Sequence, residues 1–209
     1  MMKTASKATF TGFLLQQGIL KFGDFTLKDG SKSPFFLDFG ALASGAAFRQ
    51  MGEFFSAAIK EHIGLEKVDF VFGPPYKAIM LAGSTAMACQ SKELPCLFRR
   101  KEAKQHGEGG DFYGHTLQAG QNYVLIDDVM SSGGTKVEAM KALPDQKCLA
   151  VLVGVDREHK AGDKTVSQRF TADTGVPVVS LIKLGALCSN LQGLVTDEQH
   201  RAMEAFCQA

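Results

Sequence analysis

From residue 68 to residue 184, the chain alternates between short apolar runs and helical patterns. The apolar runs cover 68–73, 123–129, 148–156 and 176–184, and helical patterns follow the first two at 76–90 and 133–143. Continuous apolar runs of strand length that alternate with helices are typical of parallel strands covered on both faces. We therefore expect an α/β fold with an open, mainly parallel sheet flanked by helices.

Polar residues follow three of these predicted strands. They are Gly73-Pro74, Asp127-Asp128 and Asp156-Arg157, and we take Tyr123 to Ile126 as the strand that leads to the paired acids. An open α/β sheet binds its ligands just beyond the carboxyl ends of its strands. The three groups of residues are therefore expected to meet in one crevice.

The first 64 residues predict a different local structure. Residues 10–20 have helical spacing, a hairpin turn is expected at Asp29-Gly30 between Phe-rich strands, and 45–64 predict a second helix. At 209 residues, the whole chain is expected to form one domain with at most a small appended subdomain.

The stretch VLIDDVMSSGGTK, residues 124–136, joins two adjacent carboxylates to a turn rich in hydroxyls and glycines. Ionised carboxylates only accept hydrogen bonds, so they suit the cis-hydroxyls of a ribose or a hydrated magnesium ion. The glycines allow backbone N–H groups to approach a phosphate closely at the start of the next helix. The alternative is an ordinary helix cap that follows two solvated acids. The joined pattern favours a binding site for ribose 5-phosphate.

Residues 98–114 concentrate positive charge in a chain whose net charge is only +1. Arg99, Arg100, Lys101, Lys104 and His106 lie close together, and glycines follow them. A solvated hairpin is one interpretation of such a run. The other is a lid that closes over a highly charged leaving group such as pyrophosphate. Nucleic-acid binding would need a broader basic face with exposed aromatic side chains, so no nucleic-acid partner is expected.

Composition argues against several other classes of protein. The five cysteines are widely spaced and include no C-x-x-C, which disfavours a disulfide framework or zinc site and favours a cytoplasmic location. We expect no signal peptide, because the basic stretch MMKTASKATF lacks an apolar run followed by a small-residue cleavage site. We expect no membrane association, because no apolar run approaches the roughly 18 residues that span a bilayer. Walker A and G-x-G-x-x-G patterns are absent.

Five stretches of the sequence together resemble one enzyme family. The stretch at 124–136 resembles the phosphoribosyl diphosphate signature of the type I phosphoribosyltransferases. RKEAKQHGEGG resembles the R-K-E-x-K-x-H-G loop of the orotate phosphoribosyltransferases, and FGPPYKAI resembles their pyrophosphate turn. FTLKDGSKSPFFLDFG resembles their amino-terminal hairpin, and DREHKAG resembles their D-R-x-E-x-x-x-G. The resemblance runs in one order from about residue 8 to residue 190.

The resemblance implies roles toward phosphoribosyl diphosphate. The residues that would contact this substrate outside the signature are Lys28, Tyr76, Lys77, Arg100, Lys101, Lys104 and His106. Within the signature, Asp127 and Asp128 would hold the ribose hydroxyls, with further contacts from Val129 and Met130. The 5′-phosphate would lie on Ser131, Ser132, Gly133, Gly134 and Thr135. Lys104, His106, Asp127 and Asp128 would be the catalytic residues, with Lys104 the most important.

The resemblance also implies an orotate pocket formed by Phe36, Leu37, Ser131 and Arg157. A guanidinium binds a carboxylate through paired, charge-assisted hydrogen bonds, which suits Arg157 to the carboxylate of orotate. From the residues alone, Arg157 equally suits a salt bridge with Asp156 or Glu158.

The implied reaction converts orotate and phosphoribosyl diphosphate to orotidine 5′-monophosphate and pyrophosphate, a step of pyrimidine biosynthesis. It would depend on Mg²⁺, held mainly by substrate and water with no direct protein ligand. The resemblance further implies a homodimer in which the basic loop reaches the partner's site. Within a single domain of residues 1–209, about residues 1–45 would form much of a small α+β hood over the base.

Two other functions share part of this pattern. A purine-salvage phosphoribosyltransferase would have the same ribose 5-phosphate site, but SPFFLDFG and DREHKAG argue against it. A non-catalytic regulator that senses phosphoribosyl diphosphate could lack the cationic loop, so the intact loop favours an enzyme.

Overall fold

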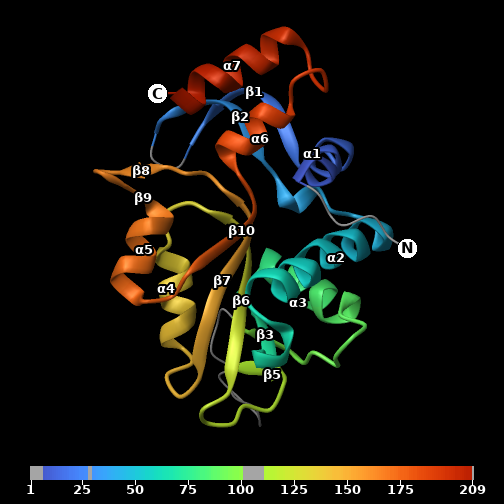
Figure 1. Ribbon diagram of the computed structural model, residues 1–209, viewed down its shortest axis with the longest axis vertical. Helices are drawn as coiled ribbons and strands as arrows, with labels where there is room; N and C mark the ends of the chain where they lie inside the picture. The colour runs from blue at the N-terminus through green and yellow to red at the C-terminus, as the bar shows by residue number, and fades with distance from the viewer. Residues whose placement is uncertain (1–6, 28–29, 101–110, 209) are drawn as a thin grey trace.

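A computed structural model of the chain describes residues 7–27, 30–100 and 111–208. At its centre is a six-stranded sheet with the order β10–β7–β6–β3–β4–β5 (Figure 1). These strands are β3 (Phe70–Gly73), β4 (Cys96–Arg99), β5 (Phe112–Gly114), β6 (Asn122–Met130), β7 (Lys147–Asp156) and β10 (Val178–Lys183). All neighbours are parallel except β5, which pairs antiparallel with β4. The predicted mainly parallel sheet is confirmed.

Helices cover both faces of this sheet. The helices α2 (Gly45–His62) and α3 (Lys77–Ala88) lie on one face, and α4 (Gly134–Lys141) and α5 (Val166–Thr174) lie on the other (Figure 1). Strand side chains alternate between the two layers: Val124 and Ile126 belong to one apolar cluster, while Tyr123 and Leu125 belong to the other. All four are at most 1% exposed, which explains why the strand has no polar positions there.

The local sequence sets where the helices begin and end. The Ser44 hydroxyl accepts from the Ala47 N–H before α2, and Thr165 forms a capping box with Gln168 before α5. The residue after α5 is Gly175, whose φ of 72° is a left-handed conformation that glycine adopts without strain.

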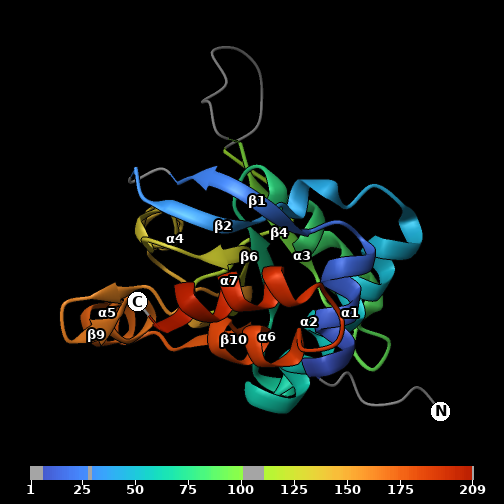
Figure 2. The ribbon, with the colours of Figure 1, turned by 90° about the horizontal axis from the view of Figure 1, so that it is seen from above.

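A second layer lies beyond the carboxyl ends of the parallel strands. The antiparallel hairpin of β1 (Leu20–Thr26) and β2 (Lys32–Leu37) packs with α1 (Lys7–Gln16), α6 (Leu184–Asn190) and α7 (Asp197–Gln208), as Figures 1 and 2 show. The hairpin and the helix at α1 were predicted, and both are confirmed. The two C-terminal helices were not predicted. Whether this layer serves as a hood over a base stays a prediction.

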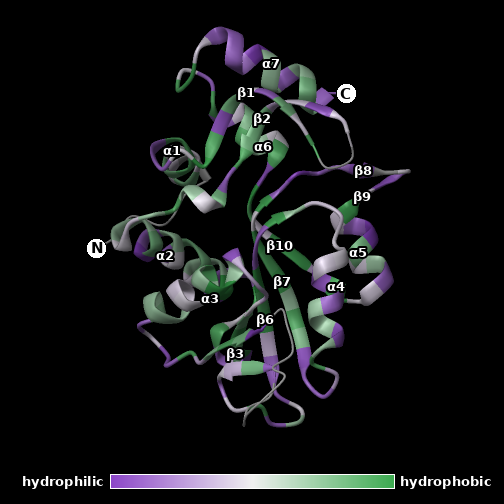
Figure 3. Ribbon diagram, turned by 180° about the vertical axis from the view of Figure 1, so that it is seen from behind, coloured by the Kyte–Doolittle hydropathy of each residue, from purple (hydrophilic) through white to green (hydrophobic). Residues whose placement is uncertain are grey.

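Short elements complete the described chain. They are the 3₁₀ helices η1 (Phe39–Ala41) and η2 (Leu65–Lys67) and the small hairpin of β8 (Lys160–Ala161) and β9 (Lys164–Thr165). Figure 3 shows largely hydrophobic residues along β7 and β10. Among the helices in the described ranges, none is both long and apolar enough to cross a membrane.

The strand before the paired acids is longer than predicted. Its predicted end at Ile126 is wrong, because β6 continues to Met130. The reason is β7, whose backbone pairs with β6 at Asp127↔Val153 and as far as Met130↔Asp156. The two acids are therefore fixed within a paired strand, and they point to opposite sides of it.

Candidate active site

A cavity of about 780 Å³ lies between the hairpin and the carboxyl ends of the sheet. Predicted residues that line it are Phe36, Leu37, Asp128, Val129, Ser131, Ser132, Gly133, Gly134 and Arg157. The structure thus brings the predicted phosphoribosyl and base residues into one space. Further lining comes from α5, whose Arg169, Phe170 and Asp173 were not predicted.

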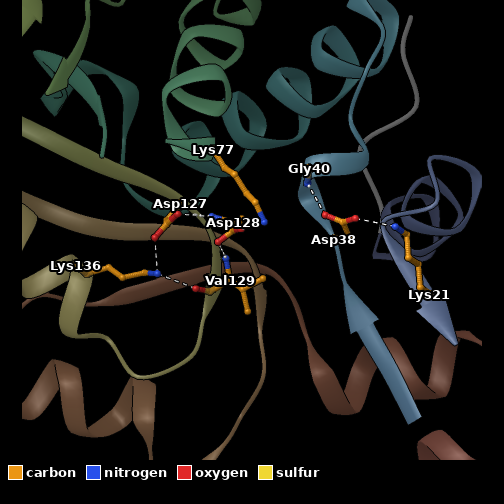
Figure 4. Close-up of polar contacts among 8 residues, drawn as sticks. All are labelled: Lys21, Asp38, Gly40, Lys77, Asp127, Asp128, Val129 and Lys136. Carbon is orange, nitrogen blue, oxygen red and sulfur yellow. Dashed lines mark hydrogen bonds and ion pairs between the residues drawn. The ribbon is translucent and has the colours of Figure 1, made fainter. Parts of the chain in front are cut away.

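Asp127 is bonded within the protein through both carboxylate oxygens. Its Oδ1 accepts from the Asp128 N–H at 2.9 Å, and its Oδ2 lies 2.5 Å from Lys136 Nζ. Lys136 also donates to the carbonyl oxygen of Val129 at 2.8 Å (Figure 4). Among the described residues that line the cavity, Asp127 is absent. Its side chain therefore serves the strand and α4 in this structure.

Asp128 faces the cavity and is held less firmly. Its Oδ1 accepts from the Val129 N–H at 2.7 Å, and its Oδ2 lies 3.7 Å from Lys77 Nζ. Burial, and then the charge of Asp127, raise the pKa of Asp128, while Lys136 and Lys77 oppose that rise. The side chain remains 21% exposed, so one carboxylate edge is accessible to a ligand.

The turn between β6 and α4 has the geometry of an anion site. Gly133 has a φ of +78°, and a Cβ there would lie 3.1 Å from Phe170 Cδ2, so this position favours glycine on both counts. Gly134 begins α4, whose first N–H groups have no partners within a helix. Ser131 and Ser132 are exposed beside them. A phosphate fits such a helix start.

Two other residues of the predicted signature lie elsewhere. The Met130 side chain is 1% exposed and belongs to the apolar cluster under α4, so its contact with a ligand would come from its backbone. Thr135 is exposed on the first turn of α4, outside the described cavity lining.

The base side of the cavity combines an aromatic ring with a cation. Phe36 is 40% exposed and lines the cavity beside the buried Leu37. The Arg157 guanidinium lies 5.4 Å from the centre of the Phe35 ring, which in turn meets Phe206 of α7 edge-on at 5.2 Å. The C-terminal helix therefore supports the ring on which Arg157 lies.

The two acids beside Arg157 make other bonds. Asp156 accepts from the Ser167 hydroxyl at 2.7 Å and from the Glu158 N–H at 3.0 Å. Glu158 accepts from the Gly185 N–H at 3.0 Å, at the start of α6. These bonds fix the chain on either side of Arg157.

The predicted pyrophosphate turn lies at the start of α3. Tyr76 is 66% exposed and follows a cis peptide bond after Pro75, and Lys77 is the first residue of the helix. Neither belongs to the described lining of the cavity. Lys77 is linked to the cavity by its ion pair with Asp128. Asp38 of the hairpin layer lies nearby (Figure 4). Lys21, first among several causes, lowers the pKa of Asp38 through a 2.7 Å ion pair.

The basic loop is described only at its two ends. β4 and β5 pair antiparallel, and Arg100 donates its N–H to the Asp111 carbonyl at 2.8 Å. The Arg100 guanidinium lies 4.5 Å from the centre of the Tyr113 ring. The loop therefore starts and ends as a hairpin at the edge of the sheet. Of the predicted site residues, Lys28, Lys101, Lys104 and His106 lie outside the described residues.

Sequence reasoning missed Lys136, although a signal for it was present. A lysine in the first turn of a helix opposes the helix dipole, which indicates that an anion lies nearby. In α4 this signal indicates an anionic partner for Lys136, and the structure shows that the partner is Asp127.

Comparisons with known proteins identify the family of the chain. Residues 41–178 match the family described as Phosphoribosyl transferase domain. The chain therefore belongs to the phosphoribosyltransferases.

Individual relatives identify a more specific family within this class. The orotate phosphoribosyltransferase of Pseudomonas syringae pv. tomato is 40% identical over 97% of this chain and 96% of its own length. A crystal structure of the Francisella tularensis orotate phosphoribosyltransferase matches with a TM-score of 0.79 at 28% identity, covering 95% of this chain and 97% of that one. Adenine phosphoribosyltransferase from Saccharomyces cerevisiae shares the fold, with a TM-score of 0.60 at 18% identity over 84% of this chain and 99% of that one. Within its class, this chain belongs to the orotate phosphoribosyltransferase family.

Proposed function

We propose that the chain transfers ribose 5-phosphate from phosphoribosyl diphosphate to orotate, giving orotidine 5′-monophosphate and pyrophosphate in pyrimidine biosynthesis. The bond from C1′ to the pyrophosphate oxygen breaks, and a bond from C1′ to a ring nitrogen of orotate forms. That nitrogen gives up its proton, which the released pyrophosphate or water can accept. The observation that supports this reaction best is the cavity itself. One wall holds an acid and a glycine turn, and the other holds Phe36 and Arg157.

The phosphoribosyl group would bind along the first wall. Asp128 would accept hydrogen bonds from the ribose hydroxyls, since its free carboxylate edge lines the cavity. Residues 131–135 would receive the 5′-phosphate at the start of α4. Asp127 would contribute indirectly, because its Oδ1 accepts from the Asp128 N–H and helps to hold Asp128 in place.

Orotate would bind at the second wall. Arg157 would pair with its carboxylate through two parallel hydrogen bonds, and the exposed face of Phe36 would cover its ring. A purine has no carboxylate, so Arg157 also favours orotate over the bases of purine salvage. With both substrates held, the nitrogen and C1′ would be aligned for reaction.

The cations would act on the leaving group. Tyr76 and Lys77 would contact the pyrophosphate from the start of α3, and Lys28, Arg100, Lys101, Lys104 and His106 would complete its surroundings. Positive charge near the departing oxygens stabilises the charge that develops in an oxocarbenium-like transition state. We assign the largest share of this stabilisation to Lys104, which the resemblance of the basic loop implies is the most important catalytic residue.

Mg²⁺ fits the oxygen-rich side of this cavity. Asp128 offers acceptor oxygens suited to a hydrated Mg²⁺, whereas no group of three or more His, Cys, Asp or Glu in the described residues is arranged as a metal site. We therefore propose that substrate and water hold the ion. When bound, it would neutralise part of the pyrophosphate charge.

We propose a homodimer as the working form. Its support is a set of exposed apolar side chains at the start of α3 and along it: Tyr76, Met80 and Met87 are 66%, 50% and 75% exposed. A second copy would bury these side chains close to the candidate pyrophosphate turn. A cytoplasmic location is proposed from the five free cysteines, which suit a reducing compartment.

A spectrophotometric assay of orotate tests the function. The purified chain is mixed with Mg²⁺, phosphoribosyl diphosphate and orotate, and we expect orotate to be consumed and pyrophosphate released. Adenine and hypoxanthine are offered in parallel. Consumption of a purine and not of orotate would contradict the proposal, and binding of phosphoribosyl diphosphate without any turnover would favour a sensing regulator.

A further inference from the structure

Lys136 is a buried cation that the motifs leave without a role. Lys136 is 3% exposed, and it lies in the first turn of α4, just after the glycine turn. A cation there opposes the helix dipole, and burial of an ammonium group is costly unless it is paired. Its position is therefore explained by its two partners, Asp127 Oδ2 at 2.5 Å and the Val129 carbonyl at 2.8 Å.

Both partners belong to β6, whereas Lys136 belongs to α4. The segment 131–133 connects these two elements, so the bonds of Lys136 to Asp127 and Val129 link the chain before this segment to the chain after it (Figure 4). A paired, buried ammonium resists movement because a shift would leave a charge without its partner. Lys136 thereby fixes the distance between the end of β6 and the start of α4.

The same pair gives the two adjacent acids different surroundings. Asp127 is bonded through both oxygens, to Lys136 and to the Asp128 N–H, and is outside the described lining of the cavity. Asp128 lines the cavity. The charge of Lys136 also opposes the rise in the pKa of Asp128 that burial and Asp127 cause.

We propose that Lys136 is a positioning residue for phosphoribosyl diphosphate. It holds Asp127 and the Val129 carbonyl so that Asp128 and the phosphate turn keep the spacing that a ribose 5-phosphate group requires. This inference rests on the proposed function. It also predicts that Lys136 affects the orotate side of the cavity much less, because Phe36 and Arg157 come from β2 and the segment after β7, and only Ser131 belongs to the turn that Lys136 holds.

The variant Lys136→Met tests the proposal, because it keeps the length of the side chain and removes the charge. We expect the KM for phosphoribosyl diphosphate to rise roughly tenfold to a hundredfold, as small displacements in a positioned site do, while the KM for orotate changes far less. Lys141→Met, on the exposed end of the same helix, is the matched control and should leave both values unchanged. A lower thermal midpoint with an unchanged KM for phosphoribosyl diphosphate would mean that Lys136 serves folding alone.

The pH dependence of binding gives a second readout. The charged groups that face Asp128 are Asp127, Lys136 and Lys77. Without the ammonium of Lys136, ionisation of Asp128 becomes harder, so binding of phosphoribosyl diphosphate should be lost at a higher pH than in the unmodified chain. An acid limb at the same pH in both proteins would contradict the proposal.

A double variant covers the case in which Lys136→Met fails to fold. Lys136→Met with Asp127→Asn removes both charges, so no unpaired charge is buried, and we expect it to fold with the KM for phosphoribosyl diphosphate still raised. A return of that KM to the unmodified value would overturn the inference. Failure of the proposed function is distinct, because the unmodified chain itself would then show no turnover.

Discussion

The two sides of the cavity are assembled in different ways. On the phosphoribosyl side, residues 127–136 form one strand, turn and helix start, and the main contacts join residues within that segment. On the base side, Phe36 comes from β2 and Arg157 follows β7. The ring beneath Arg157 is supported by Phe206 of α7, near the other end of the chain.

This difference determines how far a local change should spread. The phosphoribosyl side depends on charge pairs within one segment, so a variant there should affect one substrate and the stability of that segment. The base side depends on packing among β2, β7 and α7, so a variant far from the cavity should still alter orotate binding. Four variants test this contrast.

Asp127→Asn should have the largest effect, because it leaves the buried ammonium of Lys136 without a counter-charge. We expect the free energy of unfolding to fall by about 3 kcal/mol, with the KM for phosphoribosyl diphosphate raised. Urea unfolding at neutral pH measures it, and Asp145→Asn on the surface before β7 is the control. A stability within error of the unmodified chain would show that the Lys136 pair is not a structural anchor.

Arg157→Ala should act on the base side alone. Charge-assisted hydrogen bonds contribute about 1.5–3 kcal/mol, so the KM for orotate should rise by roughly tenfold to a hundredfold. Arg157→Lys keeps the charge but loses the paired geometry, so its KM for orotate should lie between those of the unmodified chain and of Arg157→Ala. Steady-state kinetics in which each substrate is varied in turn measures the KM for orotate and the KM for phosphoribosyl diphosphate. An equal rise in the KM for phosphoribosyl diphosphate would break the separation of the two sides.

Asp128→Asn should stabilise the fold while weakening phosphoribosyl diphosphate binding. The pKa of Asp128 is higher in the folded chain than in the unfolded chain, so the folded state favours the protonated form. Ionisation of Asp128 therefore lowers the stability of the fold as pH rises above the pKa of the unfolded chain. Removal of the charge should therefore add about 1 kcal/mol at pH 7. The gain should vanish below about pH 4, where the acid is protonated in both states. Thermal unfolding across this pH range measures the gain, and a loss of stability at pH 7 would disprove the account.

Phe206→Leu should have the smallest effect. It keeps an apolar side chain on α7 but loses the edge-on contact with Phe35, at a cost of about 1 kcal/mol in stability. The KM for orotate should rise a few-fold, since Phe35 supports Arg157. Phe54→Leu, which loses a similar contact with Phe10, is the matched control and should leave that KM unchanged. Identical kinetics in the two variants would exclude support of Arg157 by α7.

The same contrast explains what the sequence could predict. Residues 124–136 follow one another, so strand, acids and glycine turn could be recognised together, and the parallel sheet followed from apolar runs separated by helices. The end of β6 was misplaced because it depends on the length of β7, a neighbour that is distant in sequence. Lys136 was missed because its partners become visible only when α4 folds back onto β6.

The base side could be predicted only through resemblance. The contact of Phe206 with Phe35 joins the two ends of the chain, and no local pattern indicates it. Nor did any pattern indicate that α5 would line the cavity with Arg169 and Asp173. The roles of Lys28, Lys101, Lys104 and His106 stay predictions, and Lys104→Ala, which should lower turnover far more than phosphoribosyl diphosphate binding, addresses the most important of them.

Hydrogen exchange of the two sides in the presence of ligands tests the central claim most directly. Phosphoribosyl diphosphate with Mg²⁺ should slow exchange in residues 127–136 and leave residues 35–37 unchanged. Orotidine 5′-monophosphate, which carries both groups, should slow exchange in both segments. If phosphoribosyl diphosphate left residues 127–136 at the rate of the free protein, the assignment of this segment to the ribose 5-phosphate group would be wrong.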